Sequence, residues 1–147
     1  MAAPHSELRT RLAFALALTW DLAALCCNAY PDAPADHAVL LDAIRQVESG
    51  GNDRAVGDHG RSTGPLQTSR AAWADATRHG GVSWDYDALV WSWPHSQQVA
   101  VWYWQKYGCD SDEKRARCWN GGPGGHRKKS TLPYWRKVQH VLVGAGN

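Results

Sequence analysis

The chain has 147 residues and a formal net charge of +2, with 16 Lys and Arg against 14 Asp and Glu. This length predicts one domain, and apolar and charged fractions of 44% and 20% are those of a soluble globular protein. The small net charge argues against a dedicated nucleic-acid-binding protein. Nine tryptophans accompany a single phenylalanine. So many flat aromatic faces predict that some of them line a site that stacks on sugar rings or bases.

Basic residues are concentrated in the last third of the chain. They are Lys114, Arg115, Arg117, Arg127, Lys128, Lys129, Arg136 and Lys137. The cluster is either a solvated face or a surface that attracts a polyanion, such as a bacterial cell wall or nucleic acid.

Residues 1–35 have the layout of a secretory signal peptide. Arg9 and Arg11 precede the apolar stretch LAFALALTWDLAALCC, and Ala33-Pro34-Ala35 offers small residues for cleavage. The apolar stretch is too short to span a membrane, so we expect no stable membrane insertion once the leader is removed. The alternative is a native N-terminal helix. The leader interpretation predicts a secreted or periplasmic monomer whose mature domain comprises residues 36–147.

Cys109 and Cys118 are the pair that remains if Cys26 and Cys27 leave with the leader. Their short separation predicts a disulfide bond in an oxidising compartment. Two cysteines without a second close pair of Cys or His do not supply the four ligands of a tetrahedral metal site. We therefore expect neither a metal ion nor another cofactor.

The first predicted helix lies between Asp36, as its N-cap, and the Gly50-Gly51 stop. Its apolar residues recur at helical spacing: Val39, Leu40, Ala43, Ile44 and Val47. Residues 52–67 are rich in Gly, Asp and Asn and predict an ordered loop or a short irregular hairpin. A second helix is expected from about Ser69 to Arg78, and the segment GGVSWDYD breaks the helical pattern after it.

A third helix is predicted from Pro94 to Gly108, because proline favours the first helical turn and glycine the end. A short charged helix near residues 112–119 leads into the loop NGGPGG, and a last helix is expected over residues 132–142. No segment has a convincing strand pattern. The sequence therefore predicts a mainly α-helical domain with irregular glycine-rich loops and at most a minimal β-hairpin.

Glu48 ends the first predicted helix and is followed at once by Ser49-Gly50-Gly51-Asn52. The negative end of the helix dipole and the apolar neighbours both favour the protonated carboxyl at this position. A carboxylic acid that keeps its proton near neutral pH can act as the general acid in cleavage of a glycosidic bond. By itself the signal is weak, because a glutamate near a helix end is more often a solvated surface residue.

Asp58 follows in the segment VGDHGRSTGPLQ, among glycines and polar residues, where we expect it to stay ionised. Two carboxylates whose surroundings push their protonation apart form the working pair of a glycosidase. The alternative interpretation of Asp58 is an Asx-turn residue that stabilises its own loop.

Four motifs occur in a fixed order: ESGGN, GPLQ, WNGGPGG and LPYWRKV. Their order resembles the lysozyme-like superfamily and is most similar to the invertebrate-type (destabilase-like) lysozymes. The matching positions are Glu48-Ser49-Gly50, Asp58-His59-Gly60, Gly64-Pro65-Leu66-Gln67, Trp73, Asn120-Gly121-Gly122-Pro123 and residues 130–138. The resemblance covers roughly residues 38–142. Gly51 and Thr63 stand where that family has motif cysteines, so most of its disulfide bonds are absent here.

The resemblance implies a lysozyme-like catalytic domain and a muramidase. Such an enzyme hydrolyses the β-1,4 bond between N-acetylmuramic acid and N-acetylglucosamine in the glycan strands of peptidoglycan. It implies that Glu48 is the general acid and that Asp58 is the second carboxylate, acting as nucleophile or as stabiliser of the transition state. The residues that it implies in substrate binding are Ser49, Gln67, Trp73, Asn120 and Tyr134. Gln67 can instead cap the next helix, Asn120 can shape its loop and Tyr134 can simply pack.

Three other functions stay open at this point. A lytic transglycosylase would use Glu48 alone, first as acid and then as base, while a hydroxyl of the sugar attacks. A non-catalytic glycan-binding module would keep the scaffold without turnover. Nucleic-acid binding through the segment HRKK ranks last, since the net charge is low and no recognised binding motif is present.

Overall fold

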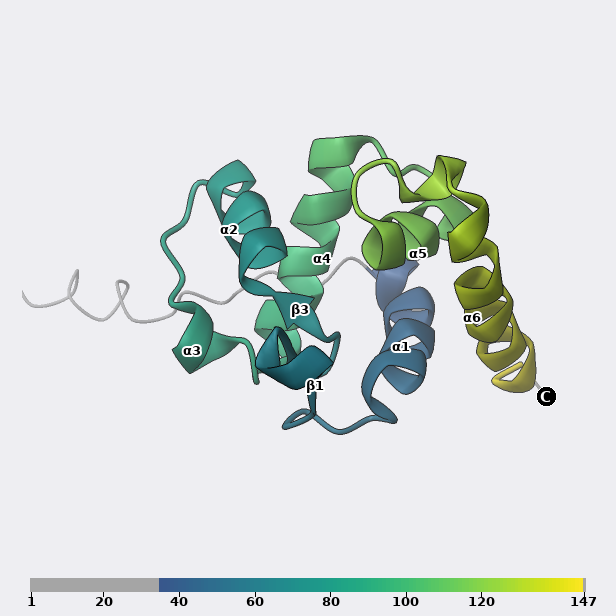
Figure 1. Cartoon of the computed structure of the whole chain (residues 1–147), viewed down its shortest axis with the longest axis horizontal. Coiled ribbons are helices and arrows are strands. Elements are labelled where there is room, and N and C mark those ends of the chain that lie inside the picture. Colours follow the sequence, from purple (N-terminus) through teal and green to yellow (C-terminus); the bar gives the residue numbers. More distant parts are fainter. Residues whose placement is uncertain (1–34, 147) are drawn as a thin grey trace, which may run out of the picture. The chain divides into compact units, whose positions relative to one another are not determined.

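The computed structural model describes residues 35–146, which form six α-helices and one small antiparallel sheet (Figure 1). The predicted leader, together with Cys26 and Cys27, lies outside the described residues, apart from Ala35, at which the first helix begins. Within the described part of the chain, no helix is both long enough and apolar enough to cross a membrane.

The helices confirm the prediction of a mainly α-helical domain. They are α1 (Ala35–Ser49), α2 (Arg70–His79), α3 (Tyr86–Leu89), α4 (Trp93–Tyr107), α5 (Asp112–Gly121) and α6 (Leu132–Gly144). Three short 3₁₀ turns accompany them: η1 (Asp58–Gly60), η2 (Gly125–Arg127) and η3 (Lys129–Thr131).

The sheet has three strands of two residues each, β1 (Val56–Gly57), β2 (Ser62–Thr63) and β3 (Thr68–Ser69), in the order β1-β2-β3. Both pairs are antiparallel, with Val56 opposite Thr63 and Thr63 opposite Thr68. A short irregular hairpin was one of the two alternatives predicted for residues 52–67. The third strand was not predicted, because two residues are too few to show an alternating pattern.

Local capping explains where three of the six described α-helices begin. The side chains of Ser69, Asp85 and Ser111 accept hydrogen bonds from the backbone N–H groups of Ala72, Ala88 and Lys114 in the first turns of α2, α3 and α5. The Asp85 cap creates α3 inside the segment that was expected to break the helical pattern. Asp36 lies in the first turn of α1 rather than at its N-cap, so the N-cap was predicted at least two residues too late.

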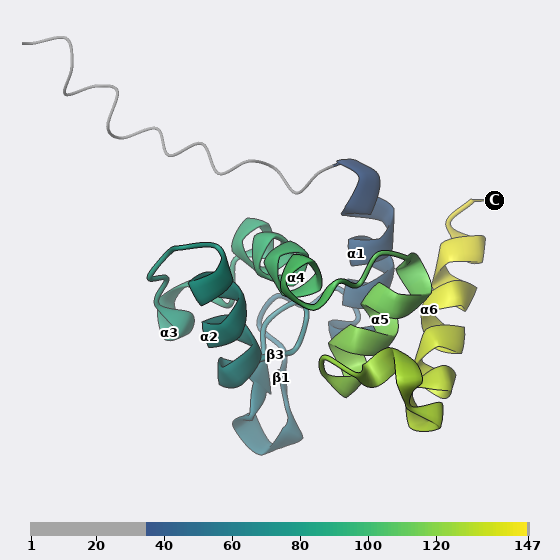
Figure 2. The same ribbon diagram turned by 90° about the horizontal axis from the view of Figure 1, so that it is seen from above.

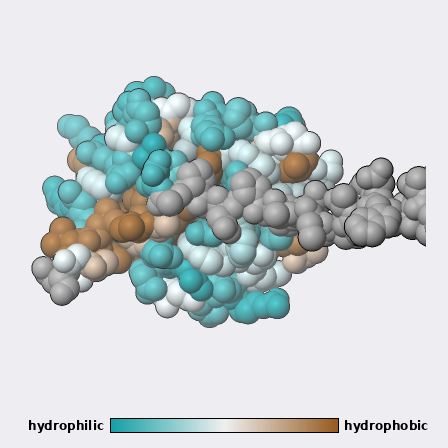
Figure 3. All heavy atoms as spheres, turned by 180° about the vertical axis from the view of Figure 1, so that it is seen from behind, coloured by the Kyte–Doolittle hydropathy of each residue, from teal (hydrophilic) through white to brown (hydrophobic). Residues whose placement is uncertain are grey.

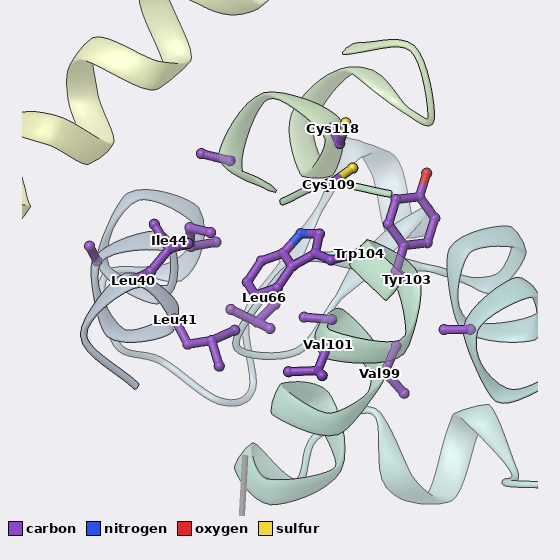
Figure 4. Close-up of a cluster of buried hydrophobic side chains, with 14 of the residues drawn as sticks. Leu40, Leu41, Ile44, Leu66, Val99, Val101, Tyr103, Trp104, Cys109 and Cys118 are labelled. Carbon is purple, nitrogen blue, oxygen red and sulfur yellow. The ribbon is translucent and has the colours of Figure 1, made fainter. Parts of the chain in front are cut away.

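Helix α4 lies between two groups of elements, with α2 and α3 on one side and α1, α5 and α6 on the other, as Figures 1 and 2 both show. The hydrophobic core forms around it (Figure 4). The fully buried side chains include Leu41 and Ile44 of α1, Leu66 before β3, Val99 and Val101 of α4, and Val138 of α6. Because these side chains come from four separate parts of the chain, the core holds the loop with β1–β3 against the helices.

A second apolar region lies at the surface, where α6 packs on α1. It borders a shallow groove of about 270 Å³ lined by Val39, Ala43, Val141, Leu142 and their neighbours. Figure 3 shows hydrophobic residues gathered at the end of the molecule that carries the C-terminus. Val39 and Val143 are 63% and 70% exposed, so the edge of the α1–α6 interface stays open to solvent.

Candidate active site

A cleft of about 480 Å³ lies between the sheet and the C-terminal end of α5. Its lining residues are Glu48, Gly57, Asp58, Ser62, Gln67, Thr68, Ser69, Ala72, Tyr103, Trp119, Asn120 and Gly122. The cleft therefore brings together four of the residues that the sequence singled out: Glu48, Asp58, Gln67 and Asn120.

Glu48 enters the cleft from the last turn of α1. Burial raises the pKa of its carboxyl from the usual 4.5 to about 7, and the negative charge of Asp58 acts in the same direction. A hydrogen bond from the Tyr134 hydroxyl to Glu48 Oε1, 2.7 Å long, and the charge of Lys137 oppose this rise. With this pKa, Glu48 keeps its proton in about half of the molecules at neutral pH, while one of its oxygens is fixed by α6.

The glycine turn after Glu48 is pinned by Arg45. Its Nη2 donates to the carbonyl of Gly51 at 3.1 Å and to Asp53 Oδ1 at 2.6 Å. Gly50 and Gly51 have φ angles of +60° and +83°, a left-handed conformation that glycine adopts without steric cost. This turn ends α1 directly behind the carboxyl of Glu48 and leads the chain toward the sheet.

Asp58 lies across the cleft on the exposed turn that joins β1 to β2. It has a positive φ of 49°, and its Oδ2 accepts a hydrogen bond of 3.0 Å from the hydroxyl of Ser62. Arg61 Nε donates to the Asp58 carbonyl at 3.1 Å. Backbone strain of this kind persists only where neighbouring groups hold the conformation, so the turn keeps the carboxylate facing the cleft.

Gln67 lines the cleft, but its side-chain amide forms hydrogen bonds with the backbone of the surrounding loop. Its Nε2 donates to the carbonyls of Ala55 and Gly64 at 3.1 and 3.0 Å. A Cβ added at Gly57 would lie 2.2 Å from Gln67 Oε1, so the backbone of β1 is in direct contact with this amide. Gln67 therefore crosslinks the loop that carries Asp58, and it does not cap α2, since Ser69 does.

Three expected substrate contacts do not line the cleft. Trp73 is only 2% exposed, and its Nε1 donates to the carbonyl of Trp84 at 2.9 Å. The Ser49 hydroxyl turns back to the carbonyl of Arg45 at 3.0 Å. Both side chains stabilise the fold, because their polar atoms donate hydrogen bonds to backbone carbonyls. Tyr134 also stays out of the lining and acts on Glu48 instead.

Two aromatic residues of the cleft were missed by sequence reasoning. Trp119, on α5, donates from Nε1 to the carbonyl of Leu66 at 2.9 Å and meets the ring of Tyr103 edge to face, with centroids 5.6 Å apart. The indole is thereby fixed between α5, α4 and the loop before β3. Its position directly before Asn120 was the available signal, since a residue that precedes a cleft-lining turn has a fair chance of facing the cleft.

Cys109 and Cys118 are buried free thiols at the junction of α4 and α5 (Figure 4). Burial, followed by a hydrogen bond to Cys118, raises the pKa of the Cys109 thiol to about 12. The predicted disulfide is not formed in this structure and stays a prediction. Within residues 35–146, no three side chains of His, Cys, Asp and Glu come together in a way that could hold a metal ion.

Known proteins with the same architecture identify the family. No family model matches the chain. A chain in the crystal structure of Aeromonas hydrophila PliI in complex with Meretrix lusoria lysozyme superposes with a TM-score of 0.63 at 29% identity, over 71% of this chain and 88% of that one. Tapes japonica lysozyme gives a TM-score of 0.60 at 28% identity over 69% and 87% of the two chains. Inhibitor-bound Meretrix lusoria lysozyme is 31% identical over 71% of this chain and 88% of its own, with a TM-score of 0.54.

The chain belongs to the invertebrate-type lysozyme family. Lysozyme 1 of Crassostrea virginica is 40% identical over 67% of this chain, and the match covers 56% of the oyster protein. The resemblance drawn from the ordered motifs is thereby confirmed. In this member of the invertebrate-type lysozyme family, Glu48 and Asp58 line the same cleft, with Gly51 and Thr63 at the two positions where the resemblance led us to expect motif cysteines.

Proposed function

We propose that the protein is a muramidase that hydrolyses the β-1,4 bond between N-acetylmuramic acid and N-acetylglucosamine in peptidoglycan. The observation that carries this proposal is the carboxyl of Glu48, which has a pKa of about 7 and lines a cleft that also contains Asp58. A general acid is most effective when its pKa lies near the working pH. The names of the similar proteins, all lysozymes, support the same activity.

Glu48 donates its proton to the bridging oxygen of the scissile bond. Tyr134 occupies Oε1 as a hydrogen-bond donor, so the transferable proton sits on Oε2. Asp58 then either attacks the anomeric carbon or stabilises the oxocarbenium-like transition state through its charge. Asn120 at the mouth of the cleft offers an amide to the polar groups of the sugar, and the ring of Trp119 offers an aromatic face.

Replacing Glu48 by Gln tests the activity. Loss of peptidoglycan lysis by at least about a thousandfold, with an unchanged circular dichroism spectrum, is the expected result, because the glutamine has no proton to give. Lysis is followed as loss of turbidity. Normal lysis by Glu48→Gln would remove this carboxyl from the mechanism. Binding without any lysis by the wild type would identify a non-catalytic glycan-binding module.

Asp58→Asn separates hydrolysis from transglycosylation. The side chain of Asp58 is exposed at the cleft rim, and a lytic transglycosylase needs no second carboxylate. The muramidase proposal expects reducing sugar ends by mass analysis of the products and a deep loss of turnover in Asp58→Asn. Anhydro-sugar ends, with turnover kept in the variant, would establish the transglycosylase instead.

The proposed enzyme acts outside the cytoplasm, as a monomer on the cell wall. The support for export is the leader pattern of residues 1–35, and the support for action on the wall is the nature of its relatives. Detection of the mature protein in the medium or the periplasm, with its N-terminus near residue 36, tests the export. Size-exclusion chromatography with light scattering tests the monomer.

A further inference from the structure

The charges of this chain are sharply divided along its sequence. No Asp or Glu follows Glu113, whereas eight Lys and Arg do. Three of those cations are neutralised locally, because Lys114, Arg115 and Arg117 form salt bridges with acidic residues at positions 110–113. The other five are Arg127, Lys128, Lys129, Arg136 and Lys137, and none of them is in a salt bridge within residues 35–146. We call these five residues the basic ridge.

The basic ridge adjoins the cleft at both of its ends. At one end, Lys128 Nζ donates to the carbonyl of Gly121 at 2.6 Å, directly beside cleft-lining Gly122. At the other, Lys137 follows Tyr134 by one turn on α6, on the face from which Tyr134 reaches Glu48. Figure 2 shows the segment between α5 and α6 running from the end of α5 to the start of α6, and Asn120 and Gly122 at that end of α5 line the cleft. The ridge thus borders the cleft on the α5–α6 side.

The middle of the ridge is available to a ligand. Lys129 and Arg136 are exposed, and no hydrogen bond or salt bridge within the described residues engages their charged groups. The charge of Lys137 acts on the carboxyl of Glu48. The other four cations have no salt bridge within the described residues, so they repel one another and destabilise the fold slightly unless an anion binds. The ridge therefore has the charge pattern of a binding surface for several anionic groups in a row.

We propose that the basic ridge binds the carboxylates of the peptide side chains on the glycan strand whose sugars occupy the cleft. This inference rests on the proposed muramidase function. A strand held by its sugars beside Gly122 carries its peptides outward past Lys128, so its carboxylates reach the ridge without a second polymer. Such contacts at an interface rim act mainly through long-range attraction, and they weaken as salt screens them.

A pelleting assay with peptidoglycan from which phosphate polymers have been removed tests the inference. Glu48→Gln serves as the background so that the polymer stays intact. Adding Lys129→Gln and Arg136→Gln is expected to weaken binding about fivefold at low salt and less than about twofold at high salt, from two exposed charge pairs. Binding of a neutral β-1,4 N-acetylglucosamine oligomer is expected to stay within about twofold, since it carries no carboxylate.

The matched control is Arg54→Gln with Arg78→Gln in the same background. It removes the same charge from two exposed side chains outside the cleft lining and outside the ridge, and binding is expected to stay within about twofold. Equal weakening by the control pair would overturn the inference, because net charge alone would then explain it. Equal weakening toward the neutral oligomer would also overturn it, as would stronger, equally salt-dependent binding to duplex DNA. If the wild type did not hydrolyse the same peptidoglycan, the proposed function would be refuted. The pelleting assay would still show whether the basic ridge binds the polymer.

Discussion

Loss of the proton from Glu48 lowers the stability of the folded protein, and unfolding measurements can detect this. A carboxyl with a pKa of about 7 in the folded protein and its usual 4.5 in the unfolded chain binds its proton more tightly when folded. Its contribution to stability is fully present below pH 4.5 and is lost as the pH rises through 7. We therefore expect Glu48→Gln to stabilise the protein at alkaline pH by about 3 kcal/mol and to change little in acid. Urea unfolding curves at several pH values measure this, and a pH-independent difference would contradict the buried carboxyl.

Tyr134 sets the pH range of the same proton. Its hydroxyl lowers the pKa of Glu48 against the larger effect of burial, so Tyr134→Phe is expected to shift the alkaline limb of the activity profile to higher pH. Turnover is expected to fall about tenfold, because the carboxyl loses the bond that orients it. Tyr107→Phe is the matched control. The hydroxyl of Tyr107 donates to the carboxylate of Asp75, and neither Tyr107 nor Asp75 lines the cleft. An unshifted limb in Tyr134→Phe would assign this tyrosine to packing alone.

At the scale of elements, the sheet depends on one glycine. Gly64 has a φ of +81°, and a Cβ there would lie 2.2 Å from the backbone oxygen of Val90. We expect Gly64→Ala to lower the free energy of unfolding by at least about 3 kcal/mol and to reduce turnover, because β2 and the Asp58 turn must move.

Gly81→Ala is the control for backbone strain. Gly81 has a similar φ of +71° but nothing within 4 Å of its added Cβ, so only the conformational cost of about 1 kcal/mol is expected. Urea unfolding measures both variants. Equal losses would show that the contact with Val90 is unimportant.

Local signals explain which elements the sequence predicts. The stops at Gly50 and Gly108 and the cap at Ser69 act within a few residues, so α1, α2 and α4 were expected within a few residues of their bounds. β3 depends instead on pairing with β2, and Trp73 reaches the core because Trp84 and Tyr86 close over it. Likewise, nothing local to Gln67 indicates that Ala55 and Gly64 will take its amide. The raised pKa of Glu48 could be predicted from the sequence, because it follows from the position of this residue at the end of an apolar helix.

At the scale of the whole molecule, aromatic packing holds the helices together. Trp84 packs against Trp102 and Trp73, with ring centroids 4.9 and 6.4 Å apart, and joins α4 to α2. Between α4 and α5 the ring of Tyr103 meets the ring of Trp119, with centroids 5.6 Å apart, and the buried thiols of Cys109 and Cys118 lie at the same junction. A covalent bond at this junction would close a short loop between the two helices.

Oxidation of that pair is therefore expected to raise the melting temperature. Closing a loop of this length stabilises a protein by about 2–3 kcal/mol, which for a domain of this size corresponds to roughly 10 °C. The measurement compares oxidised and dithiothreitol-reduced protein in which Cys26 and Cys27 are replaced by Ser, with peptide mapping to identify the bond. Cys118→Ala in the same background is the control, and its melting temperature should not respond to the reductant. Two free thiols after oxidation, or equal melting temperatures of the oxidised and reduced protein, would mean that packing alone holds α5 against α4. The position of Trp119 in the cleft wall would then depend on core packing and not on a disulfide bond.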